Sequence, residues 1–251
     1  MAPAATTPLP RLSRVRSAVK TMADRLGPRM GVGLLAALIV TVLFGVLANE
    51  VREGQTQDFD DALRMTVYGV ASPRATAVLH AITQLGSPLF LLPMTIVISL
   101  TFLHLRRIRG AILLAATMLG VSVLNWALKA FFQRPRPLPF FGLTTPASYS
   151  FPSGHSLAAF CFYGALAALV TARLRSPLLR AAVWAGAVVI VVAVGFSRLY
   201  LGVHYPSDIV GGYATGFVWV LTVASADRVF RRADKPGPKP AVAEPPPGGP
   251  A

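Results

Sequence analysis

The sequence predicts an all-α polytopic membrane protein with six transmembrane helices in a bundle. Of its 251 residues, 54% are hydrophobic and only 14% are charged, which is too apolar for an ordinary soluble domain. Six apolar stretches approach the roughly 20 residues that a helix needs to cross the hydrocarbon core of a bilayer. Lysine and arginine collect in alternate connections between these stretches, as they do in membrane proteins.

The predicted spans are, in order, about Met30–Ala48, Ser87–Leu105, Gly110–Leu128, Ser156–Ala172, Ala181–Phe196 and Ile209–Ala226. The fifth is rich in valine and would indicate a buried strand in a soluble protein. Among five other spans it predicts a helix, because a helix pairs its own backbone groups inside the bilayer. The first span ends in Ala48, at a sequence that resembles a signal-peptidase site. Its apolar core is longer than that of a signal peptide, which favours an uncleaved anchor over cleavage.

The basic residues predict the orientation of the bundle. Of the 24 lysine and arginine residues, 17 lie in the two terminal segments, the connection between the second and third spans and the connection between the fourth and fifth. Cytoplasmic loops are enriched in these residues, so both termini are expected in the cytoplasm. A sequence pI of about 11.2 also occurs in nucleic-acid-binding proteins, but here the charges lie between apolar spans. The expected partner is therefore the membrane, and no nucleic acid is expected.

One membrane domain, residues 30–228, is expected between two tails. Residues 1–29 are basic and contain proline, which predicts a cytoplasmic tail on the anionic inner surface of the membrane. Residues 229–251 are rich in proline and glycine, which predicts a disordered cytoplasmic tail.

A short amphipathic helix is predicted in the external segment 50–86. Phe59, Leu63 and Val67 recur every four residues there, among acidic residues. Such a helix either packs on the rim of the bundle or forms a surface that admits lipid from the side.

The external loop 129–155 contains five prolines, which stiffen it and prevent a helix. Its aromatic residues are Phe140, Phe141, Tyr149 and Phe151. They either anchor the loop at headgroup depth or grip the lipid.

Three polar motifs stand at the outer ends of the predicted spans. They are Lys129 with Arg136-Pro137, Pro152-Ser153-Gly154-His155, and Ser197-Arg198 with His204 and Asp208. Taken singly, each has an ordinary explanation: a lysine snorkels to the headgroups, a serine caps a helix and an aspartate interacts with a helix dipole. Because all three fall on the same side of the membrane, they are expected to converge above one pocket.

The residue types in these motifs suit the binding of phosphate. Lys129, Arg136 and Arg198 can hold its oxygens, since arginine offers a planar fork and lysine a point charge. Ser153 and Gly154 precede a helix, where free backbone N–H groups bind anions and a serine hydroxyl can add a donor.

Two histidines and one carboxylate add the groups needed for phosphoryl transfer. The spacing of four between His204 and Asp208 lets the carboxylate hold one imidazole nitrogen and leaves the other as a basic lone pair. His155 supplies a second imidazole, so that one base and one acid are available near neutral pH. No metal and no cofactor are expected, because the histidines have no further ligands at metal-binding spacings.

The three motifs resemble the signatures of the type-2 phosphatidic acid phosphatase superfamily, K-x6-RP, PSGH and SR-x5-H-x3-D, and match them at every position. The resemblance covers residues 87–226 and implies the integral membrane branch of that family. It implies that His204 attacks phosphorus to form a phosphohistidine, that Asp208 orients it, and that His155 protonates the leaving oxygen and then activates water. It also implies that the phosphate is held by Lys129, Arg136, Arg198, Ser153 and Gly154.

The expected protein is thus a multi-pass enzyme of a bacterial plasma membrane that dephosphorylates a lipid on the extracytoplasmic side. The candidate substrates are polyprenyl pyrophosphate, phosphatidic acid and phosphatidylglycerophosphate, of which polyprenyl pyrophosphate ranks slightly ahead of the other two. The alternatives are a non-catalytic binder or transporter of lipid phosphates and a lipid phosphotransferase. The sequence does not indicate the oligomeric state.

Overall fold

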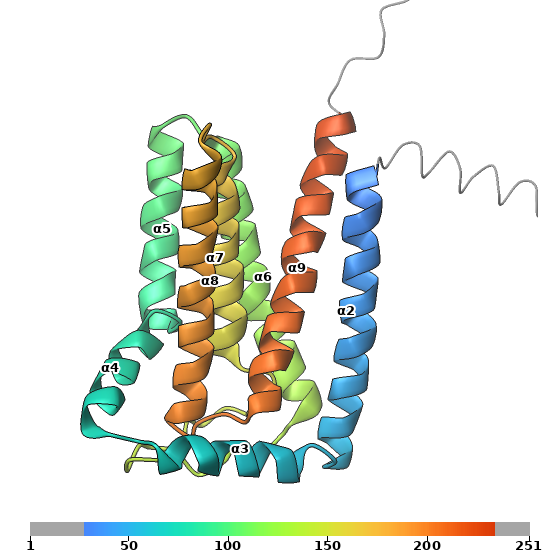
Figure 1. Ribbon diagram of the computed structural model, residues 1–251. Helices are drawn as coiled ribbons and strands as arrows, with labels where there is room; N and C mark the ends of the chain where they lie inside the picture. The colour runs from blue at the N-terminus through green and yellow to red at the C-terminus, as the bar shows by residue number, and fades with distance from the viewer. Residues whose placement is uncertain (1–27, 234–251) are drawn as a thin grey trace, which may run out of the picture.

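The computed structural model describes residues 28–233, and throughout this range the chain forms helices and loops without strands. Six helices run side by side (Figure 1): α2 (Pro28–Glu53), α5 (Pro88–His104), α6 (Ile108–Phe132), α7 (Gly154–Thr171), α8 (Pro177–Tyr200) and α9 (Pro206–Ala233). Two shorter helices, α3 (Gln57–Gly69) and α4 (Pro73–Gln84), lie at one end of this bundle. The all-α bundle predicted from the sequence is confirmed.

Five of the described helices, α2, α6, α7, α8 and α9, are long and apolar enough to cross a membrane. The predicted second span corresponds to α5, which reaches that length only together with α4, from which it is bent by 43°. Large apolar side chains such as Leu100, Leu119 and Val189 are more than half exposed on the outside of the bundle. A belt of this kind is suited to lipid and would be unfavourable in water.

Helix α7 occupies the centre of the bundle and packs against α5, α6, α8 and α9. The core around it contains Leu91, Leu114, Leu157 and Cys161, all at most 1% exposed. Helix α2 packs chiefly on α9, at the edge of the bundle. The core therefore fixes α6, α7, α8 and α9, the four helices whose ends carry the three motifs.

Serine caps and prolines set the beginnings of several helices. Ser87 and Ser176 accept hydrogen bonds from backbone N–H groups at the starts of α5 and α8, and each is followed by a proline in the first turn. Because the helices extend beyond the predicted apolar spans, motif residues lie inside their terminal turns. Lys129 is in the last turn of α6 and Arg198 in the last turn of α8.

Helix α3 packs on the end of the bundle, against α8 and α9, which agrees with the first of the two interpretations of this segment. Phe59, the first residue of the apolar pattern, is not part of this packing and is 65% exposed. The buried side chains are instead Asp60 and Arg64, at 0% and 7% exposed. Val67 packs against the apolar cluster of Tyr200, Leu201 and Val203.

The Phe151 side chain is not exposed to headgroups or lipid, although both interpretations of its loop required this. It is 0% exposed and packs with Phe44 and Phe132, at ring-centroid distances of 5.9 and 4.9 Å. Helix α9 runs to Ala233, into the predicted tail 229–251, and the rest of that tail lies outside the described residues.

Candidate active site

The three motifs meet at the end of the bundle that carries α3. There, a cavity of about 240 Å³ is lined by Lys129, Arg136, Gly154, His155, Arg198 and His204, with Pro88, Val121, Ser122 and Asn125 also in its wall. Three larger cavities, of about 960, 400 and 260 Å³, contain none of the histidines or basic residues of the motifs. We place the chemistry in the smaller cavity because it alone among these four collects the two imidazoles and the three cations.

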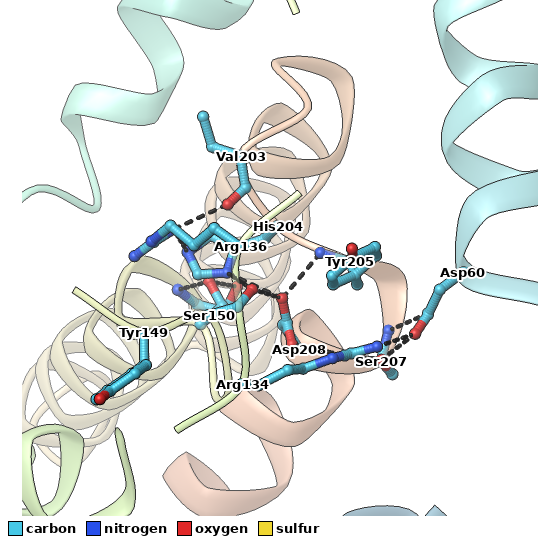
Figure 2. A network of polar contacts seen from close by, with 12 residues as sticks. Asp60, Arg134, Arg136, Tyr149, Ser150, Val203, His204, Tyr205, Ser207 and Asp208 are labelled. Carbon is cyan, nitrogen blue, oxygen red and sulfur yellow. Dashed lines mark hydrogen bonds and ion pairs between the residues drawn. The ribbon is translucent and has the colours of Figure 1, made fainter. Parts of the chain in front are cut away.

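His204 lies in the short loop between α8 and α9 and is 1% exposed. Its Nδ1 is 3.2 Å from Asp208 Oδ2, and its Nε2 is 3.1 Å from Arg136 Nη1 (Figure 2). The carboxylate selects the tautomer with the proton on Nδ1, so Nε2 keeps its lone pair. Burial lowers the pKa of His204 to about 3, against the opposing effect of Asp208. The imidazole is therefore neutral near pH 7 and able to act as a nucleophile.

Asp208 lies in the first turn of α9 and is completely buried. Its Oδ2 accepts hydrogen bonds from His204 Nδ1, from the Ser150 hydroxyl and, at 2.8 Å, from the backbone N–H of Tyr205. Its Oδ1 accepts a hydrogen bond of 2.9 Å from Arg134. Both carboxylate oxygens are thus occupied, which fixes the plane of the carboxylate and the direction in which it holds His204.

Backbone carbonyl groups hold two of the cations. Arg136 donates to Ser148 O at 2.6 Å and to Val203 O at 2.8 Å, and Lys129 donates to the carbonyl of Tyr149. Burial lowers the pKa of Arg136, but a guanidinium keeps its charge in proteins. These contacts fix both positive charges at the wall of the cavity while each side chain retains donors for a ligand.

Arg198 is the third cation and enters the cavity from the end of α8. Its Nη1 donates to Thr83 Oγ1 at 2.8 Å, which ties α8 to α4. Within residues 28–233, its buried Nε has no hydrogen-bond partner. A buried donor without a partner is costly, and an anion in the cavity would satisfy it.

Gly154 and Ser153 stand at the start of α7, where the sequence predicted anion-binding N–H groups. A Cβ at Gly154 would lie 2.7 Å from Asn125 Oδ1, so any larger residue here would displace the Asn125 side chain on α6. Ser153 is 0% exposed and caps α7, since its hydroxyl oxygen accepts from Ser156 N at 3.4 Å and from Ser156 Oγ at 3.0 Å. Ser153 is thus a helix cap, which was the ordinary explanation for a serine at this position. In both contacts its hydroxyl oxygen is the acceptor, so the hydroxyl proton remains available as a donor.

Four side chains that support this site were not singled out by the sequence as site residues. They are Asp60, Thr83, Arg134 and Ser150. Arg134 lies inside the first motif, two residues before Arg136. Both arginines precede a proline, and this repeat was the one feature of the sequence that could have indicated a shared role. Asp60 and Thr83 lie far from the motifs in sequence, so only the fold reveals their role.

The arrangement is suited to a tetrahedral oxyanion. Three fixed cations and a helix amino terminus surround one cavity, and a neutral imidazole nitrogen faces into it. Within the described part of the chain, no group of three or more His, Cys, Asp or Glu residues is placed to hold a metal ion. The described residues can therefore bind phosphate with positively charged side chains and N–H donors.

Comparison with known proteins gives consistent similarities. Residues 110–231 match the PAP2 superfamily. The phosphatidylglycerophosphatase B of Bacillus subtilis (strain 168) is 33% identical over 194 residues, which cover 76% of this chain and 94% of that protein. The undecaprenyl-diphosphatase of Sulfolobus acidocaldarius is 31% identical over 140 residues, which cover 54% of this chain and 62% of that protein.

The fold is also similar to a solved structure. The crystal structure of a transmembrane PAP2 type phosphatidylglycerolphosphate phosphatase from Bacillus subtilis matches with a TM-score of 0.71 and 32% sequence identity. The match covers 78% of this chain and 98% of the solved chain. The bundle is therefore arranged as in a known transmembrane phosphatase.

Replacing Arg198 by glutamine should weaken the binding of orthovanadate, a phosphate analogue, by roughly 10- to 100-fold, since a hydrogen bond to a charged group contributes about 1.5–3 kcal/mol. Binding is measured as the vanadate-dependent rise in the unfolding temperature of the detergent-solubilised protein. The control is Arg175→Gln, an exposed residue between α7 and α8, at the other end of the bundle. Equal vanadate stabilisation of both variants would exclude Arg198 from the anion site.

Proposed function

This chain belongs to the PAP2 superfamily of membrane lipid phosphatases, and we propose that it hydrolyses a phosphate or pyrophosphate monoester of a membrane lipid through a phosphohistidine on His204. The observation that carries the proposal is the position of His204 Nε2, a neutral imidazole nitrogen at the wall of a cavity that also contains three cations. A non-catalytic binder or transporter would need the cations but not this oriented histidine, and a phosphotransferase would share the intermediate.

In the first step, Nε2 of His204 attacks phosphorus and the bond between phosphorus and the lipid oxygen breaks. The leaving oxygen takes the bonding electron pair and a proton from His155, which lines the same cavity. Positive charge develops on the imidazole and is stabilised by Asp208, 3.2 Å from Nδ1. Lys129, Arg136, Arg198 and the N–H groups at the start of α7 hold the charge on the equatorial oxygens.

In the second step, His155 takes a proton from water, and the resulting hydroxide attacks the phosphorus of the phosphohistidine. The P–N bond breaks, its electron pair returns to Nε2, and inorganic phosphate leaves. Both histidines are then in their starting protonation states. The cations need not move between the steps, because the same oxygens are held throughout.

The relatives guide the choice of substrate. Phosphatidylglycerophosphatase B aligns over 94% of its own length, whereas the undecaprenyl-diphosphatase aligns over 62%. We therefore rank phosphatidylglycerophosphate first, ahead of polyprenyl pyrophosphate and phosphatidic acid, whereas the sequence alone had favoured polyprenyl pyrophosphate. All three present a terminal phosphate on a lipid anchor.

The purified protein should release inorganic phosphate from phosphatidylglycerophosphate faster than from undecaprenyl pyrophosphate or phosphatidic acid in mixed micelles of equal lipid fraction. The measurement is kcat/KM for each lipid, with the His204→Ala protein as the blank. Phosphate release from none of the three lipids would contradict the proposed activity. A different order of kcat/KM among the three lipids would support the phosphatase activity but contradict the choice of phosphatidylglycerophosphate as the preferred substrate.

The two histidines should respond differently to the leaving group. His204→Ala should abolish phosphoenzyme formation with every substrate, because it removes the nucleophile. His155→Ala should slow transfer from a lipid monoester by about 10²–10⁴-fold, and the defect should shrink with p-nitrophenyl phosphate, whose leaving group needs little protonation. Rapid quenching measures both steps. Equal defects of the two variants across leaving groups would show that the roles are wrongly assigned.

We also propose that the active-site end of the bundle faces the extracytoplasmic side, as the distribution of basic residues predicts. Thr144 is exposed at this end and Arg175 is exposed at the other, while the native Cys161 is buried. In intact cells, a membrane-impermeant maleimide should label Thr144→Cys and not Arg175→Cys, and both should react after permeabilisation. The reverse pattern in intact cells would contradict this orientation.

A further inference from the structure

Helix α3 turns a charged face toward the active site. Asp60 and Arg64 are buried beneath it at 0% and 7% exposed, while Phe59 and Met65 on its other faces are 65% and 57% exposed. A buried carboxylate is strongly destabilising unless it is paired and hydrogen-bonded. The burial of Asp60 therefore needs a compensating partner, and that partner belongs to the site.

Asp60 is held by residues that adjoin the proposed nucleophile. Its Oδ2 accepts hydrogen bonds from Arg134 Nη2 at 2.8 Å and from Ser207 Oγ at 2.6 Å, and its Oδ1 accepts one from Ser207 N at 3.0 Å. Arg134 uses its other terminal nitrogen, Nη1, to donate to Asp208 Oδ1 at 2.9 Å. Figure 2 shows this continuous chain of contacts from Asp60 through Arg134 to Asp208 and His204.

We propose that Asp60 is a positioning residue of the active site, which acts through Arg134 on Asp208 and so on the nucleophile His204. This inference rests on the proposed function, in which His204 attacks phosphorus. It makes the peripheral helix α3 a functional part of the site, whereas the three motifs alone place the site on the ends of α6, α7, α8 and α9.

The first reason is geometric. Asp208 holds His204 with Oδ2, and the orientation of Oδ2 depends on what fixes Oδ1. Arg134 is the residue that fixes Oδ1, and its guanidinium is itself oriented by Asp60 and by the ring of Tyr205, whose centroid is 4.1 Å from Arg134 Cζ. Loss of Asp60 would remove the ion pair of Nη2 and leave it only longer contacts with uncharged groups, Gln57 Oε1 at 3.3 Å and Thr56 Oγ1 at 3.5 Å, which would loosen the carboxylate plane.

The second reason is electrostatic. Asp208 must remain negative to stabilise the imidazolium-like charge that develops on His204 during phosphoryl transfer. Arg134 alone would neutralise that charge, because the two form a buried ion pair. Asp60 forms a second buried ion pair with the same guanidinium, so the three groups together retain one negative charge. Because of Asp60, Arg134 can hold the Asp208 carboxylate in position without cancelling its negative charge.

A purely structural role, in which the ion pair only fastens α3 to the bundle, makes a different prediction. Arg64 provides the matched control, because it lies one turn from Asp60 on the same face and fastens α3 to the backbone carbonyls of Leu138 and Gly202, at 3.0 and 3.3 Å. Arg64 donates to neither Asp60 nor Asp208. Fastening and positioning can therefore be separated by comparing Asp60→Asn with Arg64→Gln.

The test is the rate constant of His204 phosphorylation by p-nitrophenyl phosphate, measured by rapid quenching of the full-length protein in detergent. Asp60→Asn should lower this rate constant about 10- to 100-fold, the scale expected when a catalytic group is misplaced. The apparent affinity for the substrate should change little. Arg64→Gln should keep the wild-type rate constant. Because the burst amplitude reports the folded fraction, the rate constant remains interpretable if either variant is less stable.

A double-mutant cycle then tests whether Asp60 acts through Asp208. Asp60→Asn should slow phosphorylation much less in an Asp208→Asn background than in the wild type, because the group on which it acts is already lost. The inference would be overturned if the rate defects of the two single variants multiplied in the double variant, or if Asp60→Asn alone kept the wild-type rate constant. If His204→Ala still formed a phosphoenzyme, the proposed function itself would fail, which is a separate outcome. Arg134→Lys keeps the positive charge, but a lysine lacks the two terminal nitrogens with which Arg134 contacts Asp60 and Asp208 at the same time. This variant should therefore reproduce the Asp60→Asn defect.

Discussion

The buried carboxylate of Asp208 is the interaction on which the rest of this site depends. Removing one partner of a buried ion pair costs about 3–5 kcal/mol, so a charge at 0% exposure must be matched by its surroundings. Its partners come from separate parts of the chain: Arg134 and Ser150 follow α6, and His204 and Tyr205 precede α9. The ion pair and hydrogen bonds that this one carboxylate requires therefore hold the two loops against each other and set the position of His204 at the same time.

The bilayer explains why the chemistry is confined to one end of the bundle. Polar groups are costly within the hydrocarbon, so the helices carry their charges in terminal turns. Lys129 and Arg198 occupy the last turns of α6 and α8, and Gly154 opens α7. Each is thus held by a rigid helix whose position is set by the apolar core around α7. This gives the preorganised charge that phosphoryl transfer requires, since the protein need not reorganise as charge develops.

The helices and the motifs were predictable because both depend on local information. Six apolar stretches and three spacings predicted the bundle and the residues of the cavity, including the fifth span despite its many valines. The orientation of α3 was not predictable, since its apolar pattern was compatible with packing on the bundle or with a surface for lipid, and gave no sign that Asp60 would be buried. The burial of Asp60 is decided instead by Arg134 and Ser207, which lie 74 and 147 residues away in sequence. Likewise, Phe151 resembles an interfacial aromatic residue until Phe44 and Phe132 enclose it.

The contact between Arg136 and His204 links substrate binding to the exposure of the nucleophile. In the structure, Arg136 Nη1 lies 3.1 Å from His204 Nε2 and donates to the lone pair that attacks phosphorus in the proposed mechanism. A phosphate oxygen carries more negative charge than a neutral imidazole nitrogen, so it competes for the same guanidinium and forms the stronger hydrogen bond. In the proposed mechanism, Arg136 would exchange its contact with Nε2 for one with a phosphate oxygen while its hydrogen bonds to Ser148 O and Val203 O stay in place, and Nε2 would become free. Asp208 holds the ring from the opposite side, at Nδ1, so the imidazole keeps its orientation when Arg136 leaves. If His204 is the nucleophile, as proposed, the binding of an anion in the cavity would thus also make the Nε2 lone pair available on the side of that anion.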